Sequence, residues 1–231
     1  MANQMNRRMF LGGLGAAAAI QTADFATAAN SASSEKVLIV GVSCSPRKGK
    51  TTSTAVQEAL KAAKEVDARI ETELLDLGGM EIKGWSGGAK PGEAAKIVDD
   101  FPLIEPTLRD PRLGGLIIGS PSYFRSMSSL CKAFLERCAV LRKPKLLLAD
   151  KPVGVVAVGA YRNGGQELVI EQILTAMLCH EVMCVGGKPR AHQGATLWNA
   201  YKDDITKDEF GMDSARKVGI RVAEAALKLM K

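Results

Sequence analysis

Short apolar runs alternate with segments of helical spacing along most of the chain. The runs are rich in Val, Ile and Leu and cover residues 37–42, 70–75, 113–118, 153–158 and 182–185, of which 70–75 also contains Glu71 and Glu73. Continuous apolar runs of this length predict strands that are buried on both faces. Amphipathic helices between such strands indicate an α/β fold, in which helices cover both faces of a parallel sheet.

One of the intervening segments illustrates the helical spacing. Its apolar positions recur every three or four residues, at Met127, Leu130, Cys131, Phe134, Cys138 and Leu141, while Lys132, Glu136 and Arg137 occupy the other side. We therefore expect Cys131 and Cys138 to lie in the core. They are about 10.5 Å apart along a helix axis, which is too far for a disulfide.

The segment after the first predicted strand concentrates groups that bind anions. Residues 41–53 read Gly-Val-Ser-Cys-Ser-Pro-Arg-Lys-Gly-Lys-Thr-Thr-Ser, and a helical pattern follows. Backbone N–H groups, hydroxyl groups, Arg47 and the positive end of a helix are thereby presented to one anion. The sequence predicts a phosphate site here rather than an ordinary turn with solvated lysines.

A nucleotide-binding P-loop is one alternative for these residues. Gly49-Lys50-Thr51 supplies the second half of the motif Gly-x4-Gly-Lys-[Ser/Thr]. Cys44 stands where the first glycine is needed, and only glycine readily adopts the backbone conformation of that position. Asp150 follows an apolar run and would be the magnesium ligand, but a better strand begins at 151–152. We interpret Asp150 as a connecting-loop residue and the P-loop enzyme as the weaker alternative.

Two further segments follow the third and fourth predicted strands. Residues 119–128 read Gly-Ser-Pro-Ser-Tyr-Phe-Arg-Ser-Met-Ser, and residues 159–167 read Gly-Ala-Tyr-Arg-Asn-Gly-Gly-Gln-Glu. Together with residues 41–53 they resemble the phosphate loop, the ring-flanking loop and the pyrimidine loop of the flavodoxin-like NADPH-dependent FMN reductases. The similarity is strongest to the branch that contains the iron-sulfur flavoproteins, and it covers about residues 36–231.

The resemblance implies a flavodoxin-like, doubly wound five-stranded parallel sheet in the order 2-1-3-4-5, within a single domain. In such sheets ligands bind beyond the carboxyl ends of the strands. The three segments follow the ends of strands one, three and four, so we expect them to converge on one pocket.

The resemblance also implies FMN as the cofactor and a contact for each segment. The residues expected to bind the FMN phosphate are Ser43, Ser45, Arg47, Thr51, Thr52 and Ser53. The residues expected to flank the ring are Pro121, Ser122, Tyr123 and Phe124, and those expected to donate to its pyrimidine edge are Arg162, Asn163 and Gly164. Thr51 stands where the family commonly has asparagine. Because the flavin supplies the chemistry, no catalytic side chain is expected.

The expected function is that of an FMN-binding oxidoreductase, of the NAD(P)H:FMN reductase or quinone reductase type. A non-enzymatic flavodoxin-like electron carrier is the main alternative, since a carrier and a reductase can share every residue named above. The redox partner is expected to be a small molecule or a protein. Relatives with these loops are commonly dimers or tetramers, which implies a homo-oligomer.

The first 28 residues have the features of a twin-arginine export signal. Arg7-Arg8 precedes an apolar stretch that ends at Ile20, and Ala26-Thr27-Ala28 is a small-residue cleavage site. The stretch is shorter than the roughly 20 residues that span a bilayer. We expect a periplasmic protein with a flexible mature start at 29–35, a domain at 36–231, and no stable membrane span after cleavage.

Composition excludes some functions. The net charge is +6, but the lysines and arginines are spread along the chain without a basic block or interleaved aromatic residues. Nucleic-acid binding is therefore not expected. His180 ends a helical segment, where a cation would suit the helix dipole.

The five cysteines predict neither a metal site nor a cluster. They include no Cys-x-x-Cys pair, and no histidine lies at zinc-ligand spacing. Iron-sulfur flavoproteins carry their cluster cysteines after the second strand, whereas residues 78–100 of this chain contain none. Cys179 and Cys184 are expected to be buried thiols, with a disulfide between them as the alternative in an oxidising compartment.

Overall fold

The computed structural model describes residues 35–85 and 99–229. These belong to one compact unit, Ser34–Lys231. The predicted export signal and most of the segment 78–100 expected to lack a cluster lie outside the described residues. None of the helices in the described part combines the length and the apolar character needed to cross a membrane.

The sheet has the predicted flavodoxin-like order. Its parallel strands are β1 (Val37–Ser43), β2 (Ile70–Asp76), β3 (Leu113–Tyr123), β5 (Pro152–Gly159), β6 (Met183–Cys184) and β7 (Ala195–Trp198). They follow one another as β2-β1-β3-β5, and β6 and β7 both pair with β5. A short antiparallel strand, β4 (Ser126–Met127), extends β3 into a hairpin.

The fifth position of the sheet differs from the prediction. The expected strand at 182–185 forms only β6, which pairs with Pro152 and Val153 at the beginning of β5. The chain then leaves the sheet and returns as β7, which pairs with Val156–Gly159. The carboxyl end of this sheet position therefore lies at Trp198, so a fourth loop follows it.

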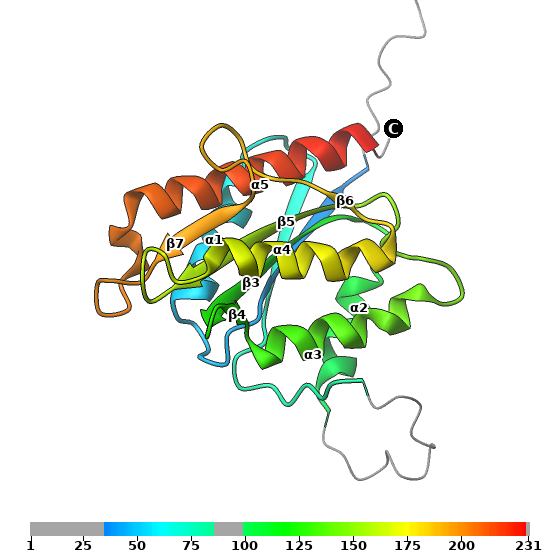
Figure 1. Cartoon of the computed structure of the whole chain (residues 1–231). Helices are drawn as coiled ribbons and strands as arrows, with labels where there is room; N and C mark the ends of the chain where they lie inside the picture. Colours follow the sequence, from blue (N-terminus) through cyan, green and yellow to red (C-terminus); the bar gives the residue numbers. More distant parts are fainter. Residues whose placement is uncertain (1–34, 86–98, 230–231) are drawn as a thin grey trace, which may run out of the picture. The chain divides into compact units, whose positions relative to one another are not determined.

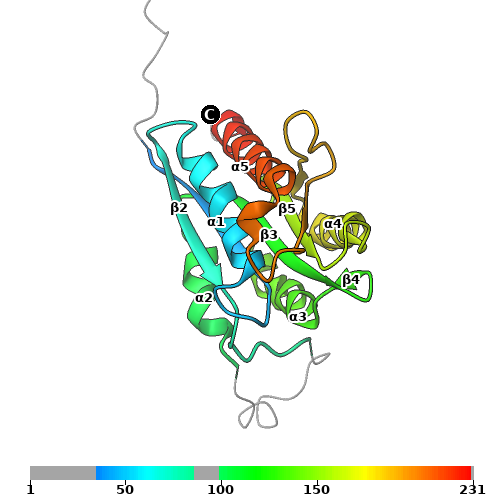
Figure 2. The ribbon, with the colours of Figure 1, turned by 90° about the vertical axis from the view of Figure 1, so that its left-hand side faces the viewer.

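Within residues 35–85 and 99–229, five helices cover the two faces of the sheet. The helices α1 (Thr51–Lys64) and α5 (Glu209–Leu229) pack on one face, and α2 (Phe101–Leu108), α3 (Ser129–Arg137) and α4 (Gln166–Met177) pack on the other (Figures 1 and 2). Short 3-10 turns lie at Cys138–Arg142, Leu178–His180 and Ile205–Lys207. This is the doubly wound arrangement predicted from the alternating pattern.

The helices α1 and α5 approach each other closely. Small buried residues on α1, among them Ala55, Ala59 and Ala63, face α5. A Cβ atom built on Gly219 of α5 would lie 1.9 Å from the Ala59 carbonyl oxygen, so only glycine fits there. This packing fixes the position of α1, whose amino end follows the predicted phosphate loop.

The structure confirms that Cys131 and Cys138 belong to the core, but Cys179 and Cys184 are exposed and unpaired, contrary to the predicted burial. The reason is that Cys184 lies in β6, an edge strand whose two residues are both exposed.

Asp150 lies in a turn before β5, as predicted. His180 is buried at the end of its helical segment, and desolvation and the nearby Arg142 lower its pKa, which disfavours the charged form that would suit the helix dipole.

Candidate functional site

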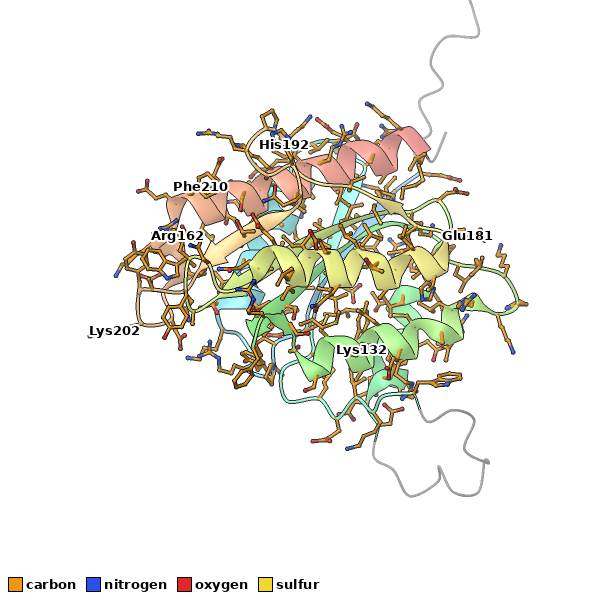
Figure 3. All side chains as sticks on the ribbon, in the orientation of Figure 1. Lys132, Arg162, Glu181, His192, Lys202 and Phe210 are labelled. Atoms are coloured by element: carbon orange, nitrogen blue, oxygen red, sulfur yellow. The ribbon has the colours of Figure 1, made fainter. Side chains whose placement is uncertain are left out.

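Four loops meet at the carboxyl edge of the sheet, and side-chain contacts join them. Ser128 Oγ donates to the Cys44 carbonyl oxygen at 2.6 Å, which links the first predicted segment to the second. Ser122 Oγ donates to the Gly164 carbonyl oxygen at 2.6 Å and links the second to the third. Figure 3 shows Arg162 of the third segment and Lys202 of the fourth loop at this end of the sheet. The three predicted segments are therefore joined to one another at this edge, while their binding of one ligand stays a prediction.

The predicted phosphate loop, residues 41–53, contains a buried hydroxyl group without a partner among the described residues. Ser43, the last residue of β1, is fully buried, and its Oγ makes no hydrogen bond within residues 35–85 and 99–229. Ser45 is also buried, and its Oγ accepts the Arg47 backbone N–H at 3.2 Å. Gly49 has a positive φ of 66° and donates its N–H to Asp76 Oδ2 at 2.7 Å, which holds the loop against β2.

The amino end of α1 has further donors that lack acceptors. No side chain caps this helix, and the first N–H groups of a helix have no acceptor within it. Thr51, Thr52 and Ser53 are buried there, and none of their hydroxyl groups has a hydrogen-bond partner in the described part of the chain. Unpaired N–H and hydroxyl groups at a helix amino end fit a phosphate group. These residues therefore suit the predicted cofactor contact.

The second segment is a strand end and a tight turn rather than a loop. β3 continues through Pro121 and Ser122 to Tyr123, and Tyr123 pairs with Ser126 of β4. The two turn residues, Phe124 and Arg125, have φ values of 50° and 64°. Two left-handed residues form the turn that matches strand twist, although glycine and asparagine are usual there. This turn leaves the Phe124 side chain fully exposed.

The third segment precedes α4 and is held by its own hydrogen bonds. The Gly164 N–H donates to the Tyr161 carbonyl oxygen at 3.1 Å, and Gln166 Nε2 donates to the same oxygen at 2.7 Å. The Arg162 guanidinium lies over the Trp198 ring, 4.4 Å from its centre. Asn163 is exposed. Of the three predicted pyrimidine donors, Gly164 thus already has an acceptor, while Arg162 and Asn163 remain available.

The second and third segments enclose a cavity of about 320 Å³. Its lining includes the predicted residues Arg162 and Asn163, and also Arg125 and Glu167, which the sequence did not single out. Arg125 packs against Gly165, where an added Cβ would lie 2.7 Å from the Arg125 Cα. The hairpin turn therefore depends on a glycine at the start of α4.

The fourth loop, residues 199–204, was missed by sequence reasoning. Asp203 of this loop accepts two hydrogen bonds from Arg47 Nη1, at 3.0 and 2.9 Å, and Trp198 before it stacks on Arg162. The available signal was the alternation Ala-Thr-Leu-Trp at 195–198, which is typical of a strand. Because the last strand was predicted at 182–185, residues 199–204 were not expected to follow a strand end at the carboxyl edge of the sheet.

Burial makes the core cysteines poor metal ligands. Desolvation and a hydrogen bond with Cys131 raise the pKa of the Cys44 thiol, and desolvation raises that of Cys138. Thiolates, rather than thiols, bind iron and zinc. The described residues contain no group of His, Cys, Asp and Glu side chains that could hold a metal ion.

Comparison with known proteins places these features in a family. Residues 37–195 match the NADPH-dependent FMN reductase family. An iron-sulfur flavoprotein of Methanocaldococcus jannaschii is 38% identical over 196 residues, covering 84% of this chain and 98% of that protein. An iron-sulfur flavoprotein of Archaeoglobus fulgidus is 34% identical over 197 residues, covering 83% and 98%.

Solved structures share the fold at low sequence identity. RosB with a bound 8-demethyl-8-formylriboflavin-5'-phosphate intermediate superposes with a TM-score of 0.64 at 17% identity, covering 85% of this chain and 80% of that one. A flavodoxin, the WrbA-like protein of Agrobacterium tumefaciens, gives a TM-score of 0.54 at 16% identity, covering 84% and 99%. These likenesses confirm the flavodoxin-like fold.

Proposed function

Because this chain belongs to the NADPH-dependent FMN reductase family and FMN is its cofactor, we propose that it is a reductase whose flavin accepts electrons from NAD(P)H in vitro. Bound FMN supplies the redox chemistry, since its ring takes up hydride or single electrons. The electrons then pass to a small-molecule or protein acceptor, including a quinone.

The observation that supports this proposal is the set of unpaired donors at the start of α1, at the same edge of the sheet as an exposed aromatic turn. Ser43, Thr51, Thr52 and Ser53 offer hydroxyl groups to a phosphate, and the free N–H groups of α1 add to them. Arg162 and Asn163 lie at a cavity that the hairpin of β3 and β4 closes. A guanidinium at that edge stabilises the negative charge that a flavin pyrimidine gains on reduction.

The absorbance of the purified protein tests this function. We expect a flavin spectrum with one FMN per chain, which bleaches rapidly on anaerobic addition of NADH or NADPH. The electron carrier is the competing function, and it predicts a stable yellow protein that bleaches only with dithionite. A colourless protein that binds ATP would instead favour the P-loop enzyme.

We also propose that the protein is exported in folded form to the periplasm. The support is Arg7-Arg8 before the apolar stretch and the small residues 26–28. An exported enzyme meets no evident pool of NAD(P)H, so its physiological donor is then a quinone, a cytochrome or another exported redox protein. Residues 1–35 fused to a folded reporter should direct it to the periplasm, and Arg7→Lys with Arg8→Lys should abolish this. A reporter that stays cytoplasmic with the intact signal restores NAD(P)H as the donor.

A homo-oligomer, dimer or tetramer, is proposed as the working assembly. Phe124 and Tyr161 are large aromatic residues exposed beside the site, which suits a surface covered by a second copy. Light scattering after size-exclusion chromatography measures the mass, and a monomer at micromolar concentration contradicts the proposal.

A further inference from the structure

The ion pair between Arg47 and Asp203 joins the phosphate loop to the fourth loop. Both Asp203 carboxylate oxygens accept from a single guanidinium nitrogen, Nη1. The Nε and Nη2 groups of Arg47 donate to no acceptor in the described residues. The edge formed by these two nitrogens can bind a phosphate group through two parallel hydrogen bonds. Asp203 thus holds Arg47 and leaves its bidentate edge free.

Asp203 is itself held in place before any ligand binds. Asn199 Nδ2 donates to Asp203 Oδ1 at 2.9 Å, and the Asp204 N–H donates to the Tyr201 carbonyl oxygen at 2.9 Å to close the turn. The hydrogen bonds from Asn199 and Arg47 lower the pKa of Asp203, because both stabilise its charged carboxylate. The acceptor that orients Arg47 is therefore fixed in both position and charge.

The backbone of the fourth loop is unusual. Lys202 and Asp203 have consecutive positive φ values of 51° and 69°, a conformation that non-glycine residues rarely adopt. Both partners of the ion pair are partly exposed, with 47% of the Arg47 side chain and 35% of the Asp203 side chain accessible. Exposed ion pairs contribute little to stability, so the pair alone does not explain this strained conformation. Strain of this kind is concentrated at ligand-binding sites.

We propose that Asp203 is a positioning residue for cofactor selection: it orients the Arg47 guanidinium so that its free edge binds the FMN phosphate. This inference rests on the proposed contact between Arg47 and the phosphate. It assigns to the fourth loop a role in distinguishing FMN from riboflavin, which lacks the phosphate.

Charge alone predicts the opposite effect, which makes the inference testable. Arg47, Lys48 and Lys50 bring three positive charges to the loop, and Asp203 and Asp76 bring two negative ones. Removing the Asp203 carboxylate makes the loop more positive. If Asp203 acted only through its charge, its loss would strengthen FMN binding; if it positions Arg47, its loss weakens FMN binding.

The experiment titrates the full-length apoprotein with FMN and with riboflavin and follows the quenching of flavin fluorescence. We expect Arg47→Ala to weaken FMN binding by about tenfold to a hundredfold. Asp203→Ala should weaken it by about twofold to tenfold, within the range of coupling between contacting residues. Riboflavin affinity should stay unchanged in both variants. In the Arg47→Ala background, Asp203→Ala should have no further effect on FMN.

The matched control is Asp204→Ala. Asp204 is the neighbouring carboxylate, but it pairs with Lys207 at 3.3 Å and with Thr206 rather than with Arg47, so FMN binding should not change. Asp203→Asn keeps the side-chain shape and is used if Asp203→Ala does not fold; the same direction of change is expected.

Tighter or unchanged FMN binding in the Asp203 variants overturns the inference, and so does an equal loss for riboflavin. An undiminished effect in the Arg47→Ala background also overturns it. These titrations measure binding, so they are independent of reduction by NAD(P)H. Wild-type protein that binds FMN without bleaching contradicts the proposed function and leaves the test of Asp203 intact.

Discussion

His180 lies in the 3-10 turn after α4 with only 4% of its surface exposed. Its Nδ1 has no hydrogen-bond partner among the described residues. Burial, and to a lesser extent Arg142, lower its pKa from the usual value, because the charged form cannot be solvated there. The folded protein therefore keeps this histidine neutral at a pH where the unfolded chain protonates it.

We predict that His180→Gln reduces the loss of stability in mild acid. The unfolded chain takes up a proton near pH 6.5 while the folded state does not, so stability falls as the pH drops from about 6.5 through the lowered folded pKa. Urea unfolding at pH 7.5, 6.5 and 5.5 measures this slope. His192→Gln is the control, since His192 is the other histidine and lies exposed. An unchanged slope in His180→Gln contradicts the prediction.

In the hairpin of β3 and β4, the residue that would be best for stability differs from the residue that is expected to contact the flavin. The turn residues Phe124 and Arg125 both adopt left-handed backbone conformations, and the Phe124 side chain is fully exposed, so its burial contributes nothing to stability. An ordinary residue pays about 1–2 kcal/mol for this conformation, whereas asparagine tolerates it. A sequence chosen for stability alone would carry asparagine or glycine here.

Phe124→Asn should therefore raise the free energy of unfolding, by up to about 1 kcal/mol. The same change removes an aromatic ring that the family resemblance assigns to the flavin, so FMN affinity or the rate of flavin reduction should fall. Chemical unfolding and flavin titration measure the two effects. Phe210→Asn is the control, because Phe210 is also exposed but lies in the regular helix α5. Lower stability in Phe124→Asn would show that the ring packs in the working protein.

The contact between α1 and α5 can be tested by the sign of the stability change that a Gly→Ala substitution causes. In an exposed helix, Gly→Ala stabilises by about 1 kcal/mol. At Gly219 the added methyl group would meet the Ala59 carbonyl oxygen, and the helices would have to separate. We predict that Gly219→Ala destabilises by about 1–3 kcal/mol, measured by chemical unfolding. Arg221→Ala, at an exposed position of the same helix, should be nearly neutral. A stabilised Gly219→Ala protein would rule out this close approach.

The chain as a whole is similar to iron-sulfur flavoproteins but lacks cysteines in the segment where the resemblance places the cluster ligands. Those relatives match over most of their length, yet residues 78–100 of this chain contain no cysteine. Three of its five cysteines are buried in the core, and the other two are exposed near β6. The side chains of this chain therefore suit FMN as a redox group, whereas residues 78–100 offer no thiolate for an iron-sulfur cluster.

Accordingly, we predict that the protein binds no iron. Protein prepared without oxygen should contain one FMN per chain but neither iron nor acid-labile sulfide, as measured by metal analysis and a sulfide assay. Stoichiometric iron and sulfide would contradict the prediction and would require ligands from a second copy or from other residue types.

The order of the strands in the sheet was implied by the family resemblance, whereas local pattern was sufficient for the alternation of strands and helices and for the three loops that follow β1, β3 and β5. Each of these features depends on residues close together in the sequence: apolar runs, helical spacing, or a motif such as Ser-Pro-Arg-Lys. The core positions of Cys131 and Cys138 follow for the same reason. Whether Ser43, Arg47 and the other proposed contacts bind FMN stays a prediction.

The interrupted last strand, the burial of His180 and the fourth loop could not be obtained in this way. Each depends on partners distant in the sequence: β7 is a strand because β5 pairs with it, and Asp203 reaches Arg47 across 156 residues. Hydrogen bonding between strands and the desolvation of side chains arise only when the chain is packed. Periodicity along the sequence thus identified the elements, and the family resemblance indicated their chemistry, whereas packing decided which loops meet at the carboxyl edge and that His180 is buried.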